Sequence, residues 1–496
     1  MADQSLVFTV DEALSMVGFG TFQGLALLFA GAGWLAEAME MMLLSFIGPT
    51  VKSEWTLSPT EESLLTTAVF GGMLVGAYFW GFISDAYGRR MGIQGAVVVV
   101  AIAGLLSASS PDYKLLIIYR CLVGFGVAGG HLSASWFMEF IPTSSRGAWM
   151  LSLTAFWTLG TLMGASLAWI VMPSLGWRWL LALSSIPAFL VLLVSNFAPE
   201  SPRFLYMKGR ATEALIILEK VALINRTKLP PGILLSDQNM DLDEENTQLD
   251  ETPLLSSIRK ERGYLETFLE STLEIFSSNL LGTTLLLWLL HFGYTFAYYG
   301  IILMISQLSS GQKECGLITI HLDNVQDASL YIRVFITSLA EFPGLIVAAV
   351  LVDRLGRKLT VEILTLFTFI LILPLLLHQN ESVTTALLFS ARMFISAAFT
   401  SLTVYAKEVY PTSTRGTGCG LATSVGRVGG MVCPLVAVGL VRGCHQTAAV
   451  ILFEVVVLIS GLCVLLFPFE TKGKNLRDIA AQVRSAAWAR AILSKT

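Results

Sequence analysis

The chain carries the same phrases twice, far apart and in the same order, and this duplication limits the possible folds more than any other feature. The phrase EFIPTSSRG at Glu139–Gly147 returns as EVYPTSTRG at Glu408–Gly416. The phrase Asp85-x-x-Gly88-Arg89-Arg90 returns as Asp353-x-x-Gly356-Arg357-Lys358. Solenoid units are only about 20 to 50 residues long, and these copies lie much further apart. The sequence therefore predicts two similar halves.

Long apolar stretches occupy most of both halves. Charged residues make up only 14% of the chain, against roughly a quarter in an ordinary soluble domain. About 20 apolar residues span a bilayer core of about 30 Å. Twelve stretches reach that length: 22–47, 63–84, 91–109, 113–137, 149–172, 179–198, 281–306, 327–351, 359–378, 383–406, 417–441 and 446–468. The predicted fold is an all-α membrane protein with 12 transmembrane helices in two pseudo-symmetric six-helix halves.

The polar segments predict how these halves are connected and oriented. The halves are expected at 1–198 and 281–468, with a linker at 199–280 and a tail at 469–496. Most of the 32 lysines and arginines fall in the linker, the tail and the short loops on the same side. Because these residues accumulate on the cytoplasmic side, both termini are expected there. The membrane is expected to be the plasma membrane or a vacuolar or endosomal membrane. Cys315 and Cys444 fall on the opposite side, and their pairing stays open.

Each half carries matching charged residues at the predicted cytoplasmic ends of its helices. Charge-assisted contacts between facing helix ends would form a latch that breaks when this side opens. A charged turn that only sets the topology is the alternative. We expect gating by Asp85, Arg89, Arg90, Glu139 and Arg146 in the first half, and by Asp353, Arg357, Glu408 and Arg415 in the second.

These motifs resemble known transporter signatures. The Asp-x-x-Gly-Arg-Arg turn resembles the loop between helices two and three of the major facilitator superfamily. Three kinds of phrase are similar to those of the sugar-porter and organic-ion branch. They are the two Glu-x-x-Pro-x-x-x-Arg-Gly phrases given above, the phrase PESPRFLYMKGR at 199–210, and the phrase PFETKG at 468–473. The resemblance implies secondary active transport by alternating access between the halves.

Longer phrases resemble the NiaP-type nicotinate carriers and their plant relatives, the organic cation/carnitine transporters, which are kin to synaptic-vesicle-related proteins. The phrases lie at Gly33–Pro49, Ser338–Ile346 and Ser424–Val441. This resemblance implies a cargo of nicotinate or a close pyridine carboxylate such as its N-methyl form. Carnitine-like zwitterions and organic cations are the alternative. A membrane receptor or vesicle protein without transport is an alternative from another class.

A hexose cargo is not expected. Sugar porters carry a Gln-Gln-x-Ser-Gly-x-Asn run before a Tyr-Tyr pair in their seventh span. Aligned on Tyr298-Tyr299, this chain has other residues where the amides and the serine would be: Trp288, Leu289, His291 and Tyr294. A site without these hydrogen-bonding groups discriminates strongly against a polyol. Its aromatic residues suit a flat ring or a quaternary ammonium group.

Acidic residues inside the predicted spans indicate a proton pathway. Glu37 and Glu40 lie three apart on one helix, project within about 60° of each other and can share one side facing the lumen. Glu341 precedes Pro343, which predicts a kink. Arg120 resembles the superfamily's fourth-span motif, and Arg392 is its approximate mirror. We expect proton symport through Glu37, Glu40, Glu341 and Arg120, with simple bonding between helices as the alternative.

Arg427 lies inside the eleventh predicted span and needs an anionic partner there. The partner is either the carboxylate of the cargo or a standing ion pair with Glu341 or Glu37. His131 is another buried candidate, for which packing with a hydrogen bond is the commoner role. The expected substrate-binding residues are Arg427, Tyr294, Tyr298, Trp34, Trp157 and His291.

Enzyme motifs are lacking in this sequence. No nucleophile and base set, phosphate loop or metal-ligand cluster occurs at a recognisable spacing. We therefore expect a monomer without cofactor, metal or nucleic-acid partner. It would act in the lipid bilayer on a small carboxylate or zwitterion, together with protons.

Overall fold

The computed structural model describes residues 7–142, 146–234, 273, 275–277, 280–314, 328–377, 379–410, 415–442, 445–467 and 470–472. Within these residues, 12 helical segments are long and apolar enough to cross a membrane. Both cysteines of the open disulfide question, Cys315 and Cys444, lie outside the described residues. The predicted helical membrane fold is confirmed. Among the described residues, the structure adds a pair of two-residue strands to the all-α fold.

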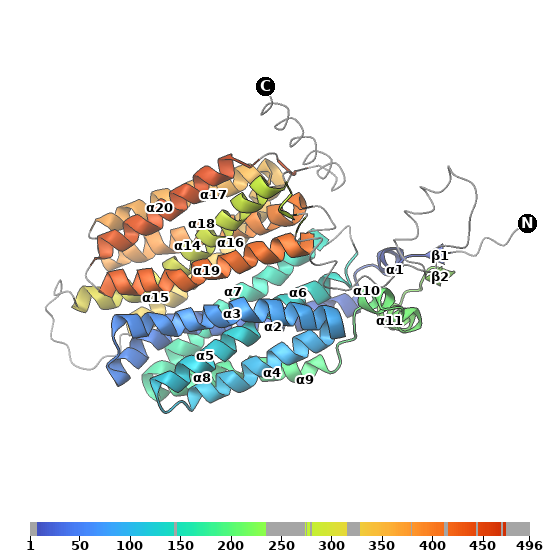
Figure 1. The fold of residues 1–496 in the computed structure, drawn as a ribbon, viewed down its shortest axis with the longest axis horizontal. Helices are drawn as coiled ribbons and strands as arrows, with labels where there is room; N and C mark the ends of the chain where they lie inside the picture. The colour runs from blue at the N-terminus through green and yellow to red at the C-terminus, as the bar shows by residue number, and fades with distance from the viewer. Residues whose placement is uncertain are drawn as a thin grey trace, which may run out of the picture.

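The spanning helices form two sets of six segments. The first half consists of α2 (Thr21–Trp55), α3 (Pro59–Tyr87), α4 (Arg89–Ala108), α5 (Tyr113–Val127) with α6 (Gly130–Met138), α7 (Arg146–Leu175), and α8 (Trp177–Ser184) with α9 (Ile186–Ser195). The second half consists of α14 (Leu281–Glu314), α15 (Ala328–Leu339) with α16 (Glu341–Leu355), α17 (Arg357–Ile372) with η3 (Leu373–Leu376), α18 (Glu381–Val409), α19 (Arg415–Arg442) and α20 (Gln446–Leu465). Figure 1 shows the halves as adjacent bundles, the first blue to green and the second yellow to red. The predicted domain limits at 198 and 281 stay a prediction.

One of the interrupted spans shows the effect of a proline. Pro343 lacks an N–H, and its ring crowds the carbonyl four positions earlier, which belongs to Leu339. The chain stops its α-helical pattern there, and the N–H of Ala340 donates to the carbonyl of Thr337 at 3.3 Å. The helix is therefore interrupted at Ala340, directly before Glu341, which is the region where the sequence predicts a kink.

The first charged motif forms a compact latch within the first half. The guanidinium of Arg89 pairs with Asp85, and its Nε donates to Glu139 Oε1 at 3.0 Å. Glu200 Oε1 accepts from the backbone N–H of Arg89 at 2.9 Å, and its Oε2 accepts from that of Arg90 at 3.2 Å. Burial raises the pKa of the Glu200 carboxyl, while the N–H groups that it accepts act in the opposite direction. The latch therefore ties α3, α4 and α6 to the start of the linker.

The second latch repeats this geometry with equivalent residues. Arg357 Nη2 donates to Glu408 Oε1 at 2.7 Å, and Glu470 Oε1 accepts from the N–H of Arg357 at 2.8 Å. Asp353 differs from its counterpart, because it is exposed and forms no ion pair with the described residues. Helices α7 and α19 begin at Arg146 and Arg415, and the side chains of these two predicted gate residues lie outside the described part of the structure.

A small module of the N-terminus and the linker covers one end of α2 (Figure 1). It contains β1 (Val7–Phe8), α1 (Val10–Val17), α10 (Pro202–Met207), α11 (Ala211–Ile224) and β2 (Ile233–Leu234). Asn225 Oδ1 accepts from the N–H of Phe22 at 2.9 Å, and Asn225 Nδ2 donates to Gln23 Oε1 at 2.7 Å. These bonds satisfy a backbone N–H that the first turn of a helix leaves free. Helix α1 was not predicted from the sequence, although the capping box from Thr9 to Glu12 indicates it.

The glycines of the two latches generate a stability prediction. Gly88 and Gly356 have φ values of +118° and +93°, and a Cβ at either would collide with Glu200 or Glu470. Gly176 has φ +81° but no atom within 4 Å of its Cβ position. Alanine at such a φ costs about 1–3 kcal/mol. We expect Gly88→Ala and Gly356→Ala to lower the melting temperature in detergent more than Gly176→Ala does. Equal losses in all three would show that the carboxylates move freely.

Candidate functional site

A cavity of about 220 Å³ lies between the two halves. Its walls come from α2, α6 and α7 of the first half and from α14, α16, α18 and α19 of the second. Five of the six predicted substrate-binding residues line it: Trp34, Trp157, His291, Tyr298 and Arg427. The fold thus gathers side chains from seven helices that the sequence leaves far apart.

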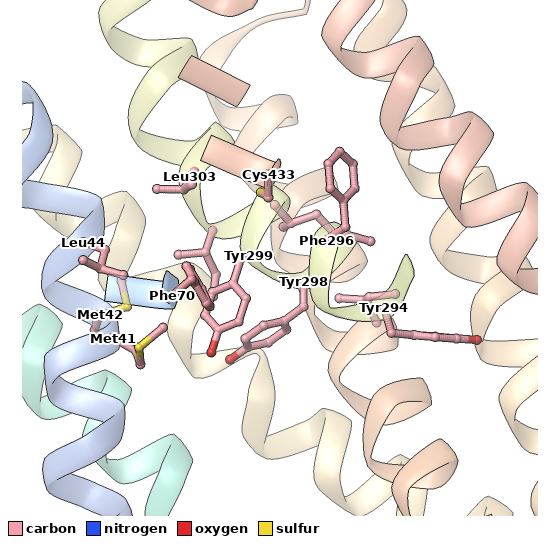
Figure 2. Close-up of a cluster of buried hydrophobic side chains, with 14 of the residues drawn as sticks. Met41, Met42, Leu44, Phe70, Tyr294, Phe296, Tyr298, Tyr299, Leu303 and Cys433 are labelled. Atoms are coloured by element: carbon pink, nitrogen blue, oxygen red, sulfur yellow. The ribbon is translucent and has the colours of Figure 1, made fainter. Parts of the chain in front are cut away.

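Tyr294 is the predicted residue that the fold places elsewhere. Its hydroxyl contacts Thr365 Oγ1 on α17, and it does not line the cavity. Figure 2 shows the hydroxyls of Tyr298 and Tyr299 directed to one region, whereas that of Tyr294 points the opposite way. Residues four apart on a helix usually share a face. Tyr294 is nevertheless buried inside the second half, against α17. Its position indicates a packing role.

Aromatic rings form much of the cavity wall. The rings of Trp34 and Trp157 lie 6.4 Å apart at 79°, and those of Tyr298 and Phe399 lie 6.5 Å apart. Trp157 Nε1 donates to the Tyr298 hydroxyl at 3.1 Å, which joins the two halves across the cavity. Ring faces carry partial negative charge and attract cations. The wall is therefore suited to a cationic or flat aromatic group.

Glu37 and Arg427 supply opposite charges to the same cavity. Arg427 Nη2 lies 3.9 Å from Glu37 Oε1 and donates instead to His131 Nε2 at 2.7 Å. Glu37 is 4% exposed, and neither of its oxygens has a hydrogen-bond partner among the described residues. A buried carboxylate without such partners is costly. Glu37 is therefore the least satisfied charge in the cavity.

Glu341 also reaches the cavity but has a partner of its own. Arg392 donates to Glu341 Oε1 from Nη2 at 2.7 Å and from Nε at 3.0 Å. The Tyr298 hydroxyl donates to the same oxygen at 2.6 Å. From the sequence, Arg427 was one possible partner of Glu341. In the structure the partner is Arg392, which lies on α18 and is fully buried.

Glu40 and Arg120 form a second buried pair, away from the cavity. Arg120 Nη1 donates to Glu40 Oε2 at 2.9 Å, and Ser184 Oγ donates to Glu40 Oε1 at 3.0 Å. The structure differs from the prediction that Glu37 and Glu40 share one lumen-facing side, because only Glu37 lines the cavity. Their angular separation of about 60° is enough to direct Glu37 into the cavity and Glu40 into the first half.

Several residues that line the cavity were missed by the sequence analysis. Ser396, Thr400 and Thr403 line it from α18, together with Phe399. Their hydroxyl groups recur at positions i, i+4 and i+7, which is the spacing of one helical face. This polar stripe on an otherwise apolar span is the signal that would have indicated them.

The comparison with known proteins agrees with this geometry. Residues 38–482 match the family described as Sugar (and other) transporter. The chain belongs to this family. It is 54% identical to Organic cation/carnitine transporter 7 of Arabidopsis thaliana, over 96% of this chain and 97% of that protein. It is 36% identical to Synaptic vesicle 2-related protein of Xenopus laevis, over 95% and 82%.

Solved structures show the same fold. The major facilitator superfamily proton:xylose symporter XylE, bound to 6-bromo-6-deoxy-D-glucose, superimposes with a TM-score of 0.67 at 18% identity, over 94% of this chain and 99% of that one. This identity is low, so the likeness concerns the fold alone. Together, family and fold make the chain a membrane transporter of the major facilitator superfamily and not an enzyme.

The buried Glu40–Arg120 pair generates a prediction. Removing one partner of such a pair leaves a charge unpaired and costs about 3–5 kcal/mol. We expect Arg120→Met to lower the melting temperature strongly, and the double variant Glu40→Met with Arg120→Met to recover part of the loss. Arg178, which pairs with Glu54 where both side chains are more than a third exposed, provides the control. Arg178→Met should cost only about 0–1 kcal/mol. Equal effects of the two single variants would contradict the prediction.

Proposed function

We propose that this transporter carries a small organic cation or a carnitine-like zwitterion by alternating access. The observation that carries the proposal is the Glu37 carboxylate, which is buried in the central cavity without a hydrogen-bond partner among the described residues. A cationic cargo would compete for this carboxylate with Arg427, whose Nη2 lies 3.9 Å from Glu37 Oε1. The name of the plant relative, Organic cation/carnitine transporter 7, supports the same class of cargo.

The neighbouring side chains fit both ends of a zwitterion. A quaternary ammonium group has no N–H to donate, so it is bound by ring faces and by a carboxylate rather than by hydrogen bonds. Trp34 and Trp157 supply ring faces, and Glu37 supplies the charge. Arg427 can hold a carboxylate through two parallel N–H bonds. Both charges of the cargo would then be neutralised.

Nicotinate, the first choice from the sequence, becomes the second candidate. The Arg427 guanidinium and the flat tryptophan rings favour a pyridine carboxylate. The same cavity places Glu37 within 3.9 Å of that guanidinium, where it repels a purely anionic cargo. The N-methyl form of nicotinate is a zwitterion and avoids this conflict.

The cavity chemistry argues against sugars. The side chains that line the cavity in the described part of the chain include no asparagine or glutamine. A polyol needs many satisfied hydrogen bonds, and a site without them discriminates against it. This lining supports a cargo other than a sugar for this member of the family.

Alternating access is supported by where the halves touch. Thr67 Oγ1 donates to the carbonyl of Met431 at 3.0 Å, and the rings of Phe70 and Tyr299 lie 4.8 Å apart. These contacts join α3 and the second half in the part of α3 that lies far from Arg89. The halves are thus joined beyond the cavity, on the side remote from the latches. We propose that the latches hold each half rigid while the halves rock, with both termini cytoplasmic and a monomer as the working unit.

Uptake into proteoliposomes tests the proposal. We expect labelled L-carnitine and labelled tetraethylammonium to enter, and Glu37→Gln to reduce their uptake about tenfold or more, since about 1.4 kcal/mol of lost binding changes affinity tenfold. Glu54→Gln is the matched control, because Glu54 lies on the same helix but outside the cavity. It should keep wild-type uptake.

The same panel separates the rival functions. Uptake of nicotinate but of neither carnitine nor tetraethylammonium would favour the pyridine carboxylates. Arg427→Lys should impair carnitine more than tetraethylammonium, because only carnitine has a carboxylate for the bidentate bond. A wild-type protein that moves none of these solutes would indicate a protein without transport, as an alternative from the sequence allows.

A further inference from the structure

The bond between Arg427 and His131 defines the protonation state of the histidine. A guanidinium has only donors, so the imidazole nitrogen that it contacts must be an acceptor. The contact is made by His131 Nε2, at 2.7 Å from Arg427 Nη2. This nitrogen therefore carries no hydrogen, and His131 is neutral in this arrangement.

A second acceptor for the same guanidinium is already in place. Arg427 Nη2 lies 3.9 Å from Glu37 Oε1, just beyond hydrogen-bond reach. Glu37 accepts no other hydrogen bond from the described residues. A displacement of about 1 Å would bring this pair to normal hydrogen-bond length. Arg427 lies on α19 of the second half, where it also bonds to the Tyr299 side chain, and it has two alternative partners in the first half.

Charged groups from three helices face His131. Glu37 lies on α2, Arg427 on α19, and Lys407 on α18 acts on His131 electrostatically. The Trp34 ring lies edge-on at 6.3 Å from the imidazole, and Tyr299 lines the same cavity. Burial and both cations oppose a positive charge on His131, and the Glu37 carboxylate favours one.

We infer that His131 is a proton-binding switch that controls whether Arg427 and Glu37 are available to the cargo. A proton that binds Nε2 removes the acceptor and places an imidazolium against the guanidinium. Arg427 then moves to Glu37 and pairs with it. Both charges that the cargo needs are then neutralised by each other. This inference rests on the proposed function for the class of cargo, but the switch itself does not.

The switch makes proton and cargo binding mutually exclusive. Each lowers the affinity for the other by the same factor, because coupling between two binding events is reciprocal. A carrier that holds either a proton or a cargo at one site exchanges them across the membrane. The arrangement therefore favours exchange of cargo for protons over the symport expected from the sequence.

Binding of labelled L-carnitine to the purified full-length protein, measured over a series of pH values, tests the switch. We expect the affinity of the wild type to fall about tenfold or more as the pH is lowered. His131→Gln keeps an oxygen acceptor for Arg427 but cannot take up a proton. It should lose most of the pH dependence of binding, whatever its affinity at the upper pH. A His131→Gln variant with the wild-type pH dependence would overturn the inference.

His291→Gln is the matched control for the pH profile. His291 lines the same cavity, but its Nδ1 bonds to the carbonyl of Leu287 in its own helix at 2.8 Å. It should keep the full pH dependence of binding. If His291→Gln alone abolished that dependence, the switch would be misassigned.

The indole emission of Trp34 follows the switch without any cargo. A protonated imidazole quenches a neighbouring indole, so the difference in emission between the wild type and Trp34→Phe should fall at low pH. The same difference measured in a His131→Gln background should stay constant. If carnitine does not bind the wild type, the proposed cargo is wrong, and this titration alone decides the switch. A Trp34 emission that ignores pH, or that still titrates with His131→Gln, would overturn it.

Discussion

The high cost of an ionised group inside an apolar bundle is the constraint on which this structure depends. An unpaired charge in such surroundings costs several kcal/mol, and two interior pairs meet this constraint with close geometry. Arg120 pairs with Glu40 inside the first half, and Arg392 pairs with Glu341 inside the second. Glu37 and Glu454 differ, because their oxygens lack hydrogen-bond partners among the described residues. Of these two carboxylates only Glu37 lines the cavity, with Arg427 3.9 Å away.

The two halves have nearly the same contacts at their latches but different ion pairs in their interiors. Arg357, Glu408 and Glu470 reproduce the bonds of Arg89, Glu139 and Glu200, down to the backbone N–H groups that the last carboxylate accepts. The interior pairs are less symmetric. Their arginines occupy corresponding spans, whereas Glu40 comes from the first span of its half and Glu341 from the second span of its half. The latches therefore maintain the shared architecture, and the departures from symmetry give the cavity its particular charges.

Much of the site was predictable because charge and aromatic residues are rare in membrane spans. Glu37, Glu341 and Arg427 were selected for that reason, and all three line the cavity. Trp34, Trp157 and His291 were also selected and also line it. Tyr294 was selected on the same grounds and lies elsewhere, since helical spacing alone does not say which of two nearby faces meets the other half. Arg392 was seen as a mirror of Arg120, but its bond to Glu341 depends on how α16 and α18 pack.

Hydrophobic length, repeated phrases and helix-end charges are local properties of the chain, so the twelve spans, the two halves and the charged motifs of the latches can be predicted from the amino-acid order. Which buried charges pair and which stay available depends on the folded arrangement. The contact of Arg427 with His131, its distance from Glu37 and the separation of Glu37 from Glu40 depend on rotations of helices against one another. Such rotations arise from packing across distant segments, and a linear pattern of residues does not record them.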